Sequence, residues 1–306
     1  MGYASSTGPI ALAHRGGGGL APENTLAAFA LTTGLGFRYL ESDLRLTRDG
    51  HLVCFHDATL DRVTDARGPL AARTLAELRS LRVEGREMIP TLDEALEAFP
   101  DAYFSVDLKD ERAIAPLVRT LKRPGVADRL CIAGAWDGWL REVRAEVPGV
   151  ATTLGWRSLT TLIACARLGI RPPRYIATAP FAHVPVQLGR MRIHIERVIE
   201  MAHDLDVRVV TWTIDEADLM HHLLDAGADA VITDRPDVLR AVFVRRDLWS
   251  PMTAHESETS ATSQTRVEME SLTSMGSVGS PASVGSSQSG GLSLRAGDHR
   301  VGPPTH

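Results

Sequence analysis

The sequence has few of the features that mark several large classes of protein. Its 306 residues include three cysteines, Cys54, Cys131 and Cys165, which are scattered among apolar residues. This usage is typical of reduced thiols in the core of a cytosolic protein and argues against a disulfide framework. The chain has 33 lysines and arginines against 38 aspartates and glutamates. The resulting net charge of −5 gives no reason to expect nucleic-acid binding.

Long apolar runs are also missing. A helix that crosses a bilayer needs about 20 consecutive apolar residues, and no segment of this chain approaches that length. The first apolar stretch, PIALAH at residues 9–14, is too short for a secretory signal and has no basic leader or cleavage site. The N-terminal MGYASS fits the loose pattern for myristoylation, but one acyl chain would anchor the protein only weakly. We therefore expect a cytoplasmic protein with no stable membrane insertion.

The composition changes near residue 251. Beyond this point the chain is rich in serine, glycine and threonine and has no aromatic residue. Such a segment cannot bury enough apolar surface to offset the entropy that is lost on ordering. We therefore predict one folded domain over residues 8–246 and a disordered C-terminal tail over residues 247–306.

Within the predicted domain, short apolar runs alternate with longer segments of helical periodicity. Eight runs are predicted strands: residues 10–13, 38–44, 102–108, 129–134, 150–154, 174–178, 208–214 and 229–234. Helical patterns lie between them, such as TLDEALEAF, in which Thr91 precedes Glu94 at capping-box spacing. Eight such units in about 240 residues predict an α/β fold, a (β/α)8 TIM barrel, in preference to a doubly wound open sheet.

Residues 45–90 interrupt this alternation between the second strand and its helix. HLVCF at residues 51–55 predicts an extra strand, and RTLAELRSL at residues 73–81 predicts a short helix. A long segment that follows a barrel strand lies on the catalytic face of the barrel. We therefore expect this small insertion to stand beside the functional site.

Carboxylates gather where two of the predicted strands end. Glu41 and Asp43 are two residues apart, so they point to the same face of a strand, and Asp107 repeats the arrangement. Three carboxylates inside a barrel repel one another unless a cation lies between them. An all-oxygen ligand set favours Mg²⁺ or Ca²⁺. The alternative is neutralisation by nearby basic side chains, namely Arg15, Arg45 and Lys109.

Two histidines stand at other predicted strand ends. Imidazole titrates near neutral pH, so His14 and His56 are candidates for a general acid and a general base. Arg15 and four glycines at residues 16–19 follow His14 and match neither a Walker A motif nor a dinucleotide fingerprint. The glycines indicate either a flexible loop or an anion site. Arg15 favours the anion site, because a guanidinium binds phosphate through two hydrogen bonds.

Six motifs follow one another along the predicted barrel. They are AHRG (13–16), APENT (21–25), ESDLRLTRDGHLVCFHDATLDRVTDARG (41–68), VDLK (106–109), VVTWTID (209–215) and ITDRP (232–236). In this order they resemble the glycerophosphodiester phosphodiesterase family. The resemblance covers about residues 10–240, and a signature of several parts is far more specific than a single short motif.

The resemblance implies a (β/α)8 barrel hydrolase of lipid and glycerol metabolism, which cleaves a glycerophosphodiester to glycerol 3-phosphate and an alcohol. It implies roles for eight side chains: a divalent metal, Mg²⁺ or Ca²⁺, on Glu41, Asp43 and Asp107; acid/base catalysis by His14 and His56; phosphate contacts from Arg15 and Lys109; and Trp212 in the pocket. The glycines at residues 16–19 are then expected to give His14 and Arg15 the slack to reach a phosphate at the barrel mouth.

Two positions depart from the family's pattern. Residue 107 is Asp where many members carry Glu, so its carboxylate reaches less far and the metal shifts or keeps an extra water. Residue 215 is Asp where Asn is usual, which is expected to add negative charge near the mouth and to alter substrate preference.

Two alternative functions remain beside the hydrolysis of small glycerophosphodiesters. One is a phospholipase D-like activity on lysophospholipid or sphingomyelin, which predicts a wide apolar entrance, although the sequence shows no obvious exposed aromatic patch. The other is a non-catalytic barrel that serves as a binding module. For the enzyme, the attacking oxygen is either a water or the substrate's own glycerol 2-hydroxyl. The sequence predicts no particular head-group alcohol and no oligomeric state.

Overall fold

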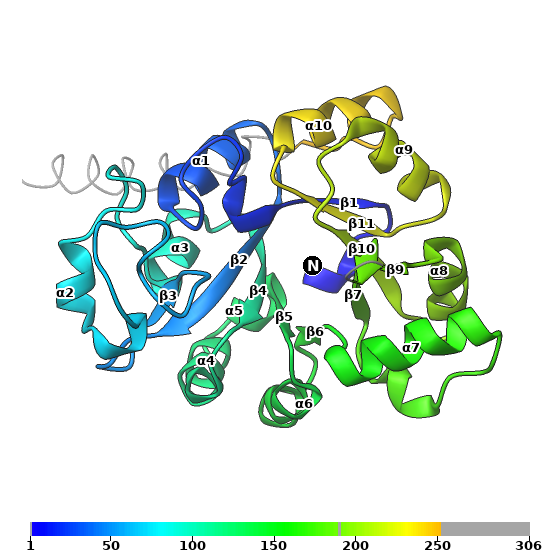
Figure 1. Ribbon diagram of the computed structural model, residues 1–306, viewed down its shortest axis with the longest axis horizontal. Coiled ribbons are helices and arrows are strands. Elements are labelled where there is room, and N and C mark those ends of the chain that lie inside the picture. The colour runs from blue at the N-terminus through cyan, green and yellow to red at the C-terminus, as the bar shows by residue number, and fades with distance from the viewer. Residues whose placement is uncertain (1, 189–190, 252–306) are drawn as a thin grey trace, which may run out of the picture. The chain divides into compact units, whose positions relative to one another are not determined.

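A ring of parallel strands forms the centre of the computed structural model, which describes residues 2–188 and 191–251 (Figure 1). In ring order the strands are β6 (Ala151–Thr152), β5 (Leu130–Gly134), β4 (Tyr103–Leu108), β2 (Tyr39–Leu46), β1 (Ile10–Ala13), β11 (Ala230–Thr233), β10 (Arg208–Trp212) and β7 (Phe181–Pro185). A single parallel bridge between Thr153 and Phe181 joins the two ends of this order. The ring is thus nearly closed, and the predicted (β/α)8 barrel is confirmed.

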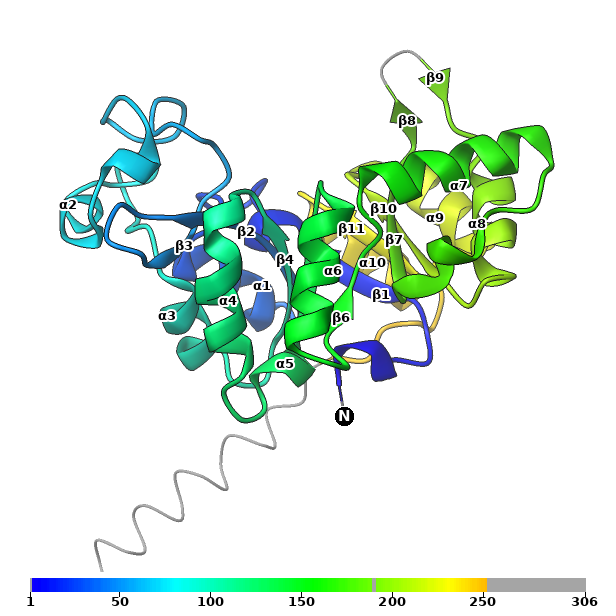
Figure 2. The ribbon, with the colours of Figure 1, turned by 90° about the horizontal axis from the view of Figure 1, so that it is seen from below.

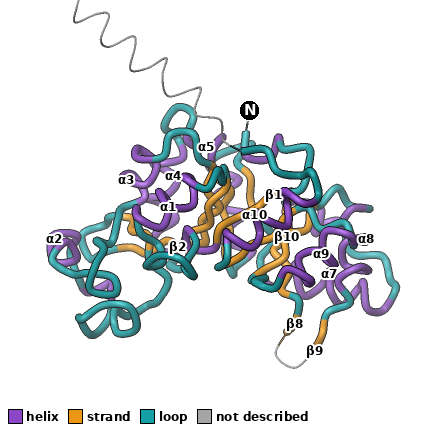
Figure 3. The backbone as a smooth tube through the Cα atoms, turned by 90° about the horizontal axis from the view of Figure 1, so that it is seen from above, coloured by secondary structure: helices purple, strands orange, loops and turns teal. Residues whose placement is uncertain are grey.

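Helices surround the strands on the outside of the ring (Figure 1), and Figure 3 distinguishes the helices in purple from the strands in orange. They are α1 (Leu26–Gly34), α3 (Leu92–Ala98), α4 (Ile114–Leu121), α5 (Val126–Arg129), α6 (Asp137–Glu146), α7 (Trp156–Leu168), α8 (Ile195–His203), α9 (Ala217–Asp225) and α10 (Pro236–Arg245). The capping box predicted at the start of α3 is present, because Thr91 and Glu94 each bond the other's backbone N–H. No helix in the described ranges is long and apolar enough to cross a membrane.

Seven of the eight predicted strands are confirmed within a few residues of their ends, and one is wrong. Residues 174–178 form a short 3-10 helix, and the strand at this place in the barrel is β7, a few residues later. Pro180 directly precedes this strand and Pro185 ends it, with four other residues between them. Because proline cannot donate a hydrogen bond to a strand neighbour, this segment does not look like a barrel strand in sequence.

The side chains that point into the barrel change in character along the strands. Tyr39, Glu41 and Asp43 alternate with outward-facing residues on β2, as the spacing predicts. In the parallel register Tyr39 pairs with Tyr103 and Asp43 pairs with Asp107. Aromatic side chains therefore fill one end of the barrel, and carboxylates meet at the carboxyl ends of the strands.

The packing extends past the predicted domain bounds of residues 8 and 246 at both ends of the domain. The Tyr3 ring is buried inside the aromatic end of the barrel, 5.3 Å from the Tyr39 ring and 5.6 Å from the Phe181 ring between centroids. The Trp249 ring lies 5.0 Å from the Phe37 ring. The rest of the tail predicted to be disordered, residues 252–306, lies outside the described residues.

The insertion after β2 has a hydrophobic cluster of its own. It contains the predicted extra strand, β3 (Leu52–Cys54), antiparallel to β2, and the predicted short helix, α2 (Leu75–Arg79). Eight buried side chains make up the cluster: Val53, Phe55, Leu60, Val63, Leu70, Leu78, Val83 and Ile89. In Figure 2 the insertion and the β8–β9 hairpin (Gln187–Leu188 and Met191–Arg192) rise at the barrel end opposite the N-terminus.

We predict that Leu60→Ala loosens the insertion and leaves the barrel closed. Leu60 is fully buried in the insertion's cluster, so its truncation costs about 2–5 kcal/mol. That loss falls on residues 55–90, because the cluster is separate from the barrel core. Backbone hydrogen exchange read segment by segment measures the effect, with the exposed Leu168→Ala as a control. An equal loss of protection in β1 and β11 would show that the insertion has no separate core.

Candidate active site

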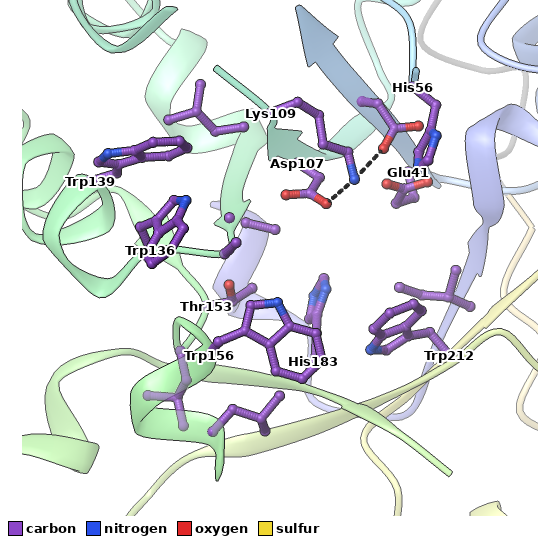
Figure 4. Close-up of a pocket in the computed structure, with 18 of the residues that line it drawn as sticks. Glu41, His56, Asp107, Lys109, Trp136, Trp139, Thr153, Trp156, His183 and Trp212 are labelled. Carbon is purple, nitrogen blue, oxygen red and sulfur yellow. Dashed lines mark hydrogen bonds and ion pairs between the residues drawn. The ribbon is translucent and has the colours of Figure 1, made fainter. Parts of the chain in front are cut away.

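A cavity of about 330 Å³ opens at the carboxyl ends of the strands (Figure 4). The structure brings all eight predicted site residues into its lining: His14, Arg15, Glu41, Asp43, His56, Asp107, Lys109 and Trp212. Four of them lie in β2, β4 and β10, and the other four follow β1, β3 and β4, so they come from segments that are far apart in sequence. The size lies at the lower end of the range for small-molecule pockets, about 300–1,000 Å³.

His14 is held by a carboxylate from the neighbouring strand. Its Nδ1 lies 2.8 Å from Oδ1 of Asp234, because β1 and β11 run side by side and both residues follow their strand ends. Its Nε2 lies 3.9 Å from Oε2 of Glu41, on the pocket side. Burial of the ring opposes protonation, but the bond to Asp234 and the charges of both carboxylates together raise the pKa of His14.

Asp215 supports the residue that holds His14. Its Oδ1 accepts a hydrogen bond from the backbone N–H of Asp234 at 2.8 Å and one from the Thr233 hydroxyl at 2.9 Å. The side-chain oxygen of an asparagine, the usual residue here in the family, could accept the same two bonds. The aspartate differs from it in carrying a negative charge. The aspartate that was expected to add charge at the mouth thus fixes the loop after β11, and it lies outside the cavity lining.

His56, which follows β3, has an equivalent arrangement. Its Nδ1 lies 2.6 Å from Oδ1 of Asp57, the next residue in the chain. The Arg62 guanidinium bonds Asp57 from the other side, with Nε 2.6 Å from Oδ2, and it holds the pKa of that carboxyl at about 2. An ionised carboxylate accepts the Nδ1–H of a neutral imidazole, so Nε2 of each histidine is left to exchange a proton.

Asp43 is buried between two cations and an amide. Its Oδ1 lies 3.0 Å from the Lys109 ammonium, and its Oδ2 accepts a 2.9 Å hydrogen bond from Asn24. The Lys109 ammonium also lies 2.5 Å from Oδ2 of Asp107, so it stands between two carboxylates (Figure 4). Burial opposes the ionised form of Asp43, but Lys109, His56 and Arg15 together lower its pKa.

Glu41 is the carboxylate with the least compensation. It accepts the backbone N–H of Arg15 at 2.8 Å, and no lysine or arginine of the described chain forms an ion pair with it. Burial and the nearby charge of Asp43 raise the pKa of Glu41 to about 7. Glu41 therefore keeps its proton to a higher pH than an ordinary glutamate does.

A chain of ion pairs links Arg15, the candidate for phosphate binding, to the carboxylate that holds His56. Arg15 has a left-handed backbone, φ 49°, and its guanidinium bonds Oε1 of Glu23 at 2.9 Å. Arg62 bonds both oxygens of Glu23, at 2.6 and 2.9 Å, and also bonds Asp57. The insertion residue Arg62 thus connects Arg15 with the carboxylate that holds His56.

Arg45 does not neutralise the carboxylates as the salt-bridge alternative expected. Its Nε and Nη2 bond the carbonyl oxygen of His56 at 3.0 and 2.9 Å, and its Nη1 bonds the carbonyl oxygen of Lys109 at 3.3 Å. The other two cations of that alternative, Arg15 and Lys109, do contact Asp43, at 3.4 and 3.0 Å.

The glycines at residues 16–19 form a hydrogen-bonded turn. The N–H groups of the last three bond the carbonyl oxygen of His14, at 2.8 and 3.1 Å, and that of Asp234, at 3.0 Å. A Cβ on Gly19 would lie 2.4 Å from the Asp234 carbonyl oxygen. The expectation of slack is therefore wrong, and these three N–H groups do not cradle a phosphate. Glycine is needed because the loop closes tightly over the residue that holds His14.

Several residues of the cavity were not predicted from the sequence. Trp136, Trp139 and Trp156 line one side of it, from the loop after β5 through the start of α7. Trp136 is 62 % exposed and Trp156 is 41 % exposed, so an aromatic patch does stand at the mouth. His183 lines the cavity from β7, and it was missed because that strand was assigned to the wrong segment. The three tryptophans within 21 residues were the available signal.

Comparison with known proteins adds the family. The glycerophosphoryl diester phosphodiesterase family matches this chain over residues 14–238. Every residue that lines the cavity lies within that range. The chain belongs to this family. The match includes the six motifs that suggested the resemblance, apart from the first residue of the first motif.

Individual relatives agree with the family match. A probable glycerophosphodiester phosphodiesterase 2 of Mycobacterium tuberculosis is 33 % identical over 246 residues, which cover 79 % of this chain and 93 % of the relative. A glycerophosphodiester phosphodiesterase of Caldanaerobacter subterraneus is 29 % identical over 75 % of this chain and 96 % of its own. A phosphodiesterase of Oleispira antarctica, solved with the product sn-glycerol-3-phosphate, is similar in structure with a TM-score of 0.65, at 28 % identity over 79 % of this chain and 99 % of its own.

We predict that Gly19→Ala damages both stability and turnover. The added Cβ has no room against the Asp234 backbone, so the loop shifts at a cost of about 1–3 kcal/mol and His14 loses its carboxylate. Urea unfolding and kcat on a phosphodiester measure the two effects. Gly34→Ala is the matched control, because a Cβ there meets nothing within 4 Å. A Gly19→Ala protein with wild-type stability and turnover would contradict the role of the tight turn.

We predict that Arg62→Ala lowers kcat by about 10–100-fold, the usual cost of losing a residue that orients a site side chain. Without the guanidinium, Asp57 and Glu23 lose their common partner, and His56 and Arg15 lose their fixed positions. Steady-state kinetics measures the effect. Arg67→Ala removes an exposed arginine of the same insertion and should leave kcat unchanged. Equal behaviour of the two variants would exclude Arg62 as a positioning residue.

Proposed function

We propose that the protein hydrolyses glycerophosphodiesters to glycerol 3-phosphate and an alcohol, with His14 and His56 as the acid/base pair. The observation that carries this proposal is the pair of imidazoles in the lining of one pocket, each bonded through Nδ1 to a carboxylate. Membership of the phosphodiesterase family supports the same reaction. So does the product complex of the Oleispira antarctica relative.

The basic side chains of the pocket suit the charge of a phosphodiester. Arg15 and Lys109 line the same cavity as the two histidines, and both are held by carboxylates. They offset the negative charge of the substrate and the further charge that develops in the transition state. One imidazole accepts a proton from the attacking oxygen, and the other donates a proton to the leaving alcohol. The pair can act in this way whether the attacking oxygen belongs to a water or to the substrate's glycerol 2-hydroxyl.

We further propose that a divalent cation, Mg²⁺ or Ca²⁺, acts with Glu41, Asp43 and Asp107. Their donor chemistry fits a hard cation, and Glu41 has no lysine or arginine of the described chain as an ion-pair partner. In the described arrangement the Lys109 ammonium takes this position between two of the carboxylates. Over residues 2–188 and 191–251 no three potential ligand side chains are close enough to hold a metal. A cation would replace Lys109 as their counter-charge, and when bound it would add Lewis-acid stabilisation of the phosphoryl oxygens.

The exposed tryptophans favour a second candidate substrate. Trp136 and Trp156 give the mouth an apolar rim, which suits the acyl chain of a lysophospholipid in a phospholipase D-like reaction. The cavity of about 330 Å³ favours the smaller diester. A comparison of glycerophosphocholine with lysophosphatidylcholine distinguishes the two. We propose a cytoplasmic location, which the three unpaired, buried cysteines support.

We predict that His14→Ala and His56→Ala each lower kcat/KM on glycerophosphocholine by about 10²–10⁴-fold. Both side chains are held at the rim of a preformed barrel, so the fold should persist, which circular dichroism and thermal melting check. His51→Ala is the control, because His51 is an exposed histidine of the insertion that lies outside the pocket. Near-wild-type turnover of either pocket variant would remove that histidine from the acid/base pair.

The same assay tests the cation and the binding-module alternative. We expect a chelator such as EDTA to abolish the turnover of the wild-type protein, and Mg²⁺ or Ca²⁺ to restore it. Undiminished turnover in excess chelator would contradict the cation. A wild-type protein that binds glycerol 3-phosphate but turns over neither substrate with any divalent metal would contradict the hydrolase itself.

A further inference from the structure

Two nitrogen atoms deep in the cavity have no partner in the described part of the chain. Nε2 of His183 and Nε1 of Trp212 are both excluded from solvent and make no hydrogen bond there. Both residues line the same cavity as the acid/base pair (Figure 4). A buried polar group normally has a partner, and leaving one unpaired destabilises the fold. Two such groups in one functional pocket indicate that a ligand supplies the partners.

The two nitrogen atoms come from neighbouring strands. His183 pairs with Val210 in the parallel register of β7 and β10, and Trp212 stands two residues further along β10. Val210 and Trp212 therefore lie on the same face of β10, and His183 faces the same way from β7. Both side chains point into the barrel, where they are diagonal neighbours. One small ligand can contact both.

The chemistry of this pair suits hydroxyl groups better than an anion. Burial lowers the pKa of His183 to about 4, so its ring is neutral and offers one N–H and one lone pair. The indole of Trp212 is a donor only. A hydroxyl both donates and accepts, so it satisfies either residue. The phosphate has its own cations in Arg15 and Lys109.

The two sides of the cavity thus differ in kind. The side of Trp136 and Trp156 is apolar and open to solvent, so it tolerates alcohols of different size. The side of His183 and Trp212 is half-buried and carries the two unpaired nitrogens. Glycerol, the constant part of a glycerophosphodiester, is small and carries two free hydroxyls, which match the two unpaired nitrogens on this side.

We propose that His183 and Trp212 form a hydroxyl-binding subsite that selects the glycerol arm of the substrate. This inference rests on the proposed function for the identity of the diol. It assigns a specificity role to His183 and a hydrogen-bonding role to Trp212, beyond lining the pocket. Neither residue is required to transfer a proton.

The test compares the binding of two phosphate monoesters by calorimetry. The probes are sn-glycerol 3-phosphate and n-propyl phosphate, which share the phosphate and the three-carbon chain but differ in two hydroxyls. We expect the wild-type protein to bind glycerol 3-phosphate at least about ten-fold more tightly, the usual effect of one or more hydrogen bonds to a buried partner. His183→Leu and Trp212→Phe should each reduce this preference by about ten-fold.

Further variants separate a lost hydrogen bond from a damaged pocket. His183→Gln restores a donor and an acceptor at this position and should recover part of the preference that His183→Leu loses. His51→Leu, outside the pocket, is the matched control and should keep it. A wild-type protein without the preference, or variants that retain it in full, would overturn the proposal. Because binding is measured without turnover, a protein that shows the preference but hydrolyses nothing would overturn the proposed function and leave the subsite standing.

Discussion

The cost of burying two carboxylates, Glu41 and Asp43, in one pocket shapes most of this site. Asp43 alone draws the Lys109 ammonium, the Arg15 guanidinium and the Asn24 amide toward itself. Those groups in turn set the backbone at residues 15 and 24, both of which have positive φ. The loop that follows β1 adopts the conformation that these contacts require. The position of His14, at the start of that loop, depends on the same conformation. Charge compensation and catalytic geometry are thus the same arrangement of atoms.

Most of the fold could be predicted because its signals are local. Alternation of apolar runs with helical periodicity located seven strands, and spacing alone placed Glu41 and Asp43 on one face. The missed strand, β7, has proline on both sides of its core, and it concealed His183. The eight expected site residues do meet in one cavity, because carboxyl ends of parallel strands share one end of a barrel.

The contacts between these residues could not be predicted, because they join segments that are far apart in sequence. Nothing local says that Asp234 bonds His14 across 220 residues, or that Arg62 bonds both Glu23 and Asp57. The role of the glycines at residues 16–19 could not be predicted either, because it depends on a segment that is distant in sequence. The composition of this run indicated flexibility, whereas the close approach of the Asp234 backbone, which only the fold reveals, requires small residues in a fixed turn.

The Arg45 contacts have a consequence for how the site is aligned. A single planar guanidinium bonds the carbonyl oxygens of His56 and Lys109, so it ties the backbone of the proposed proton-transfer residue to that of the proposed phosphate-binding residue. Main-chain carbonyls do not titrate, and a guanidinium keeps its charge across the physiological range. The spacing of the two functional side chains is therefore independent of their own protonation. In the proposed reaction, a proton that leaves or reaches His56 therefore does not disturb the backbone contacts that Arg45 makes.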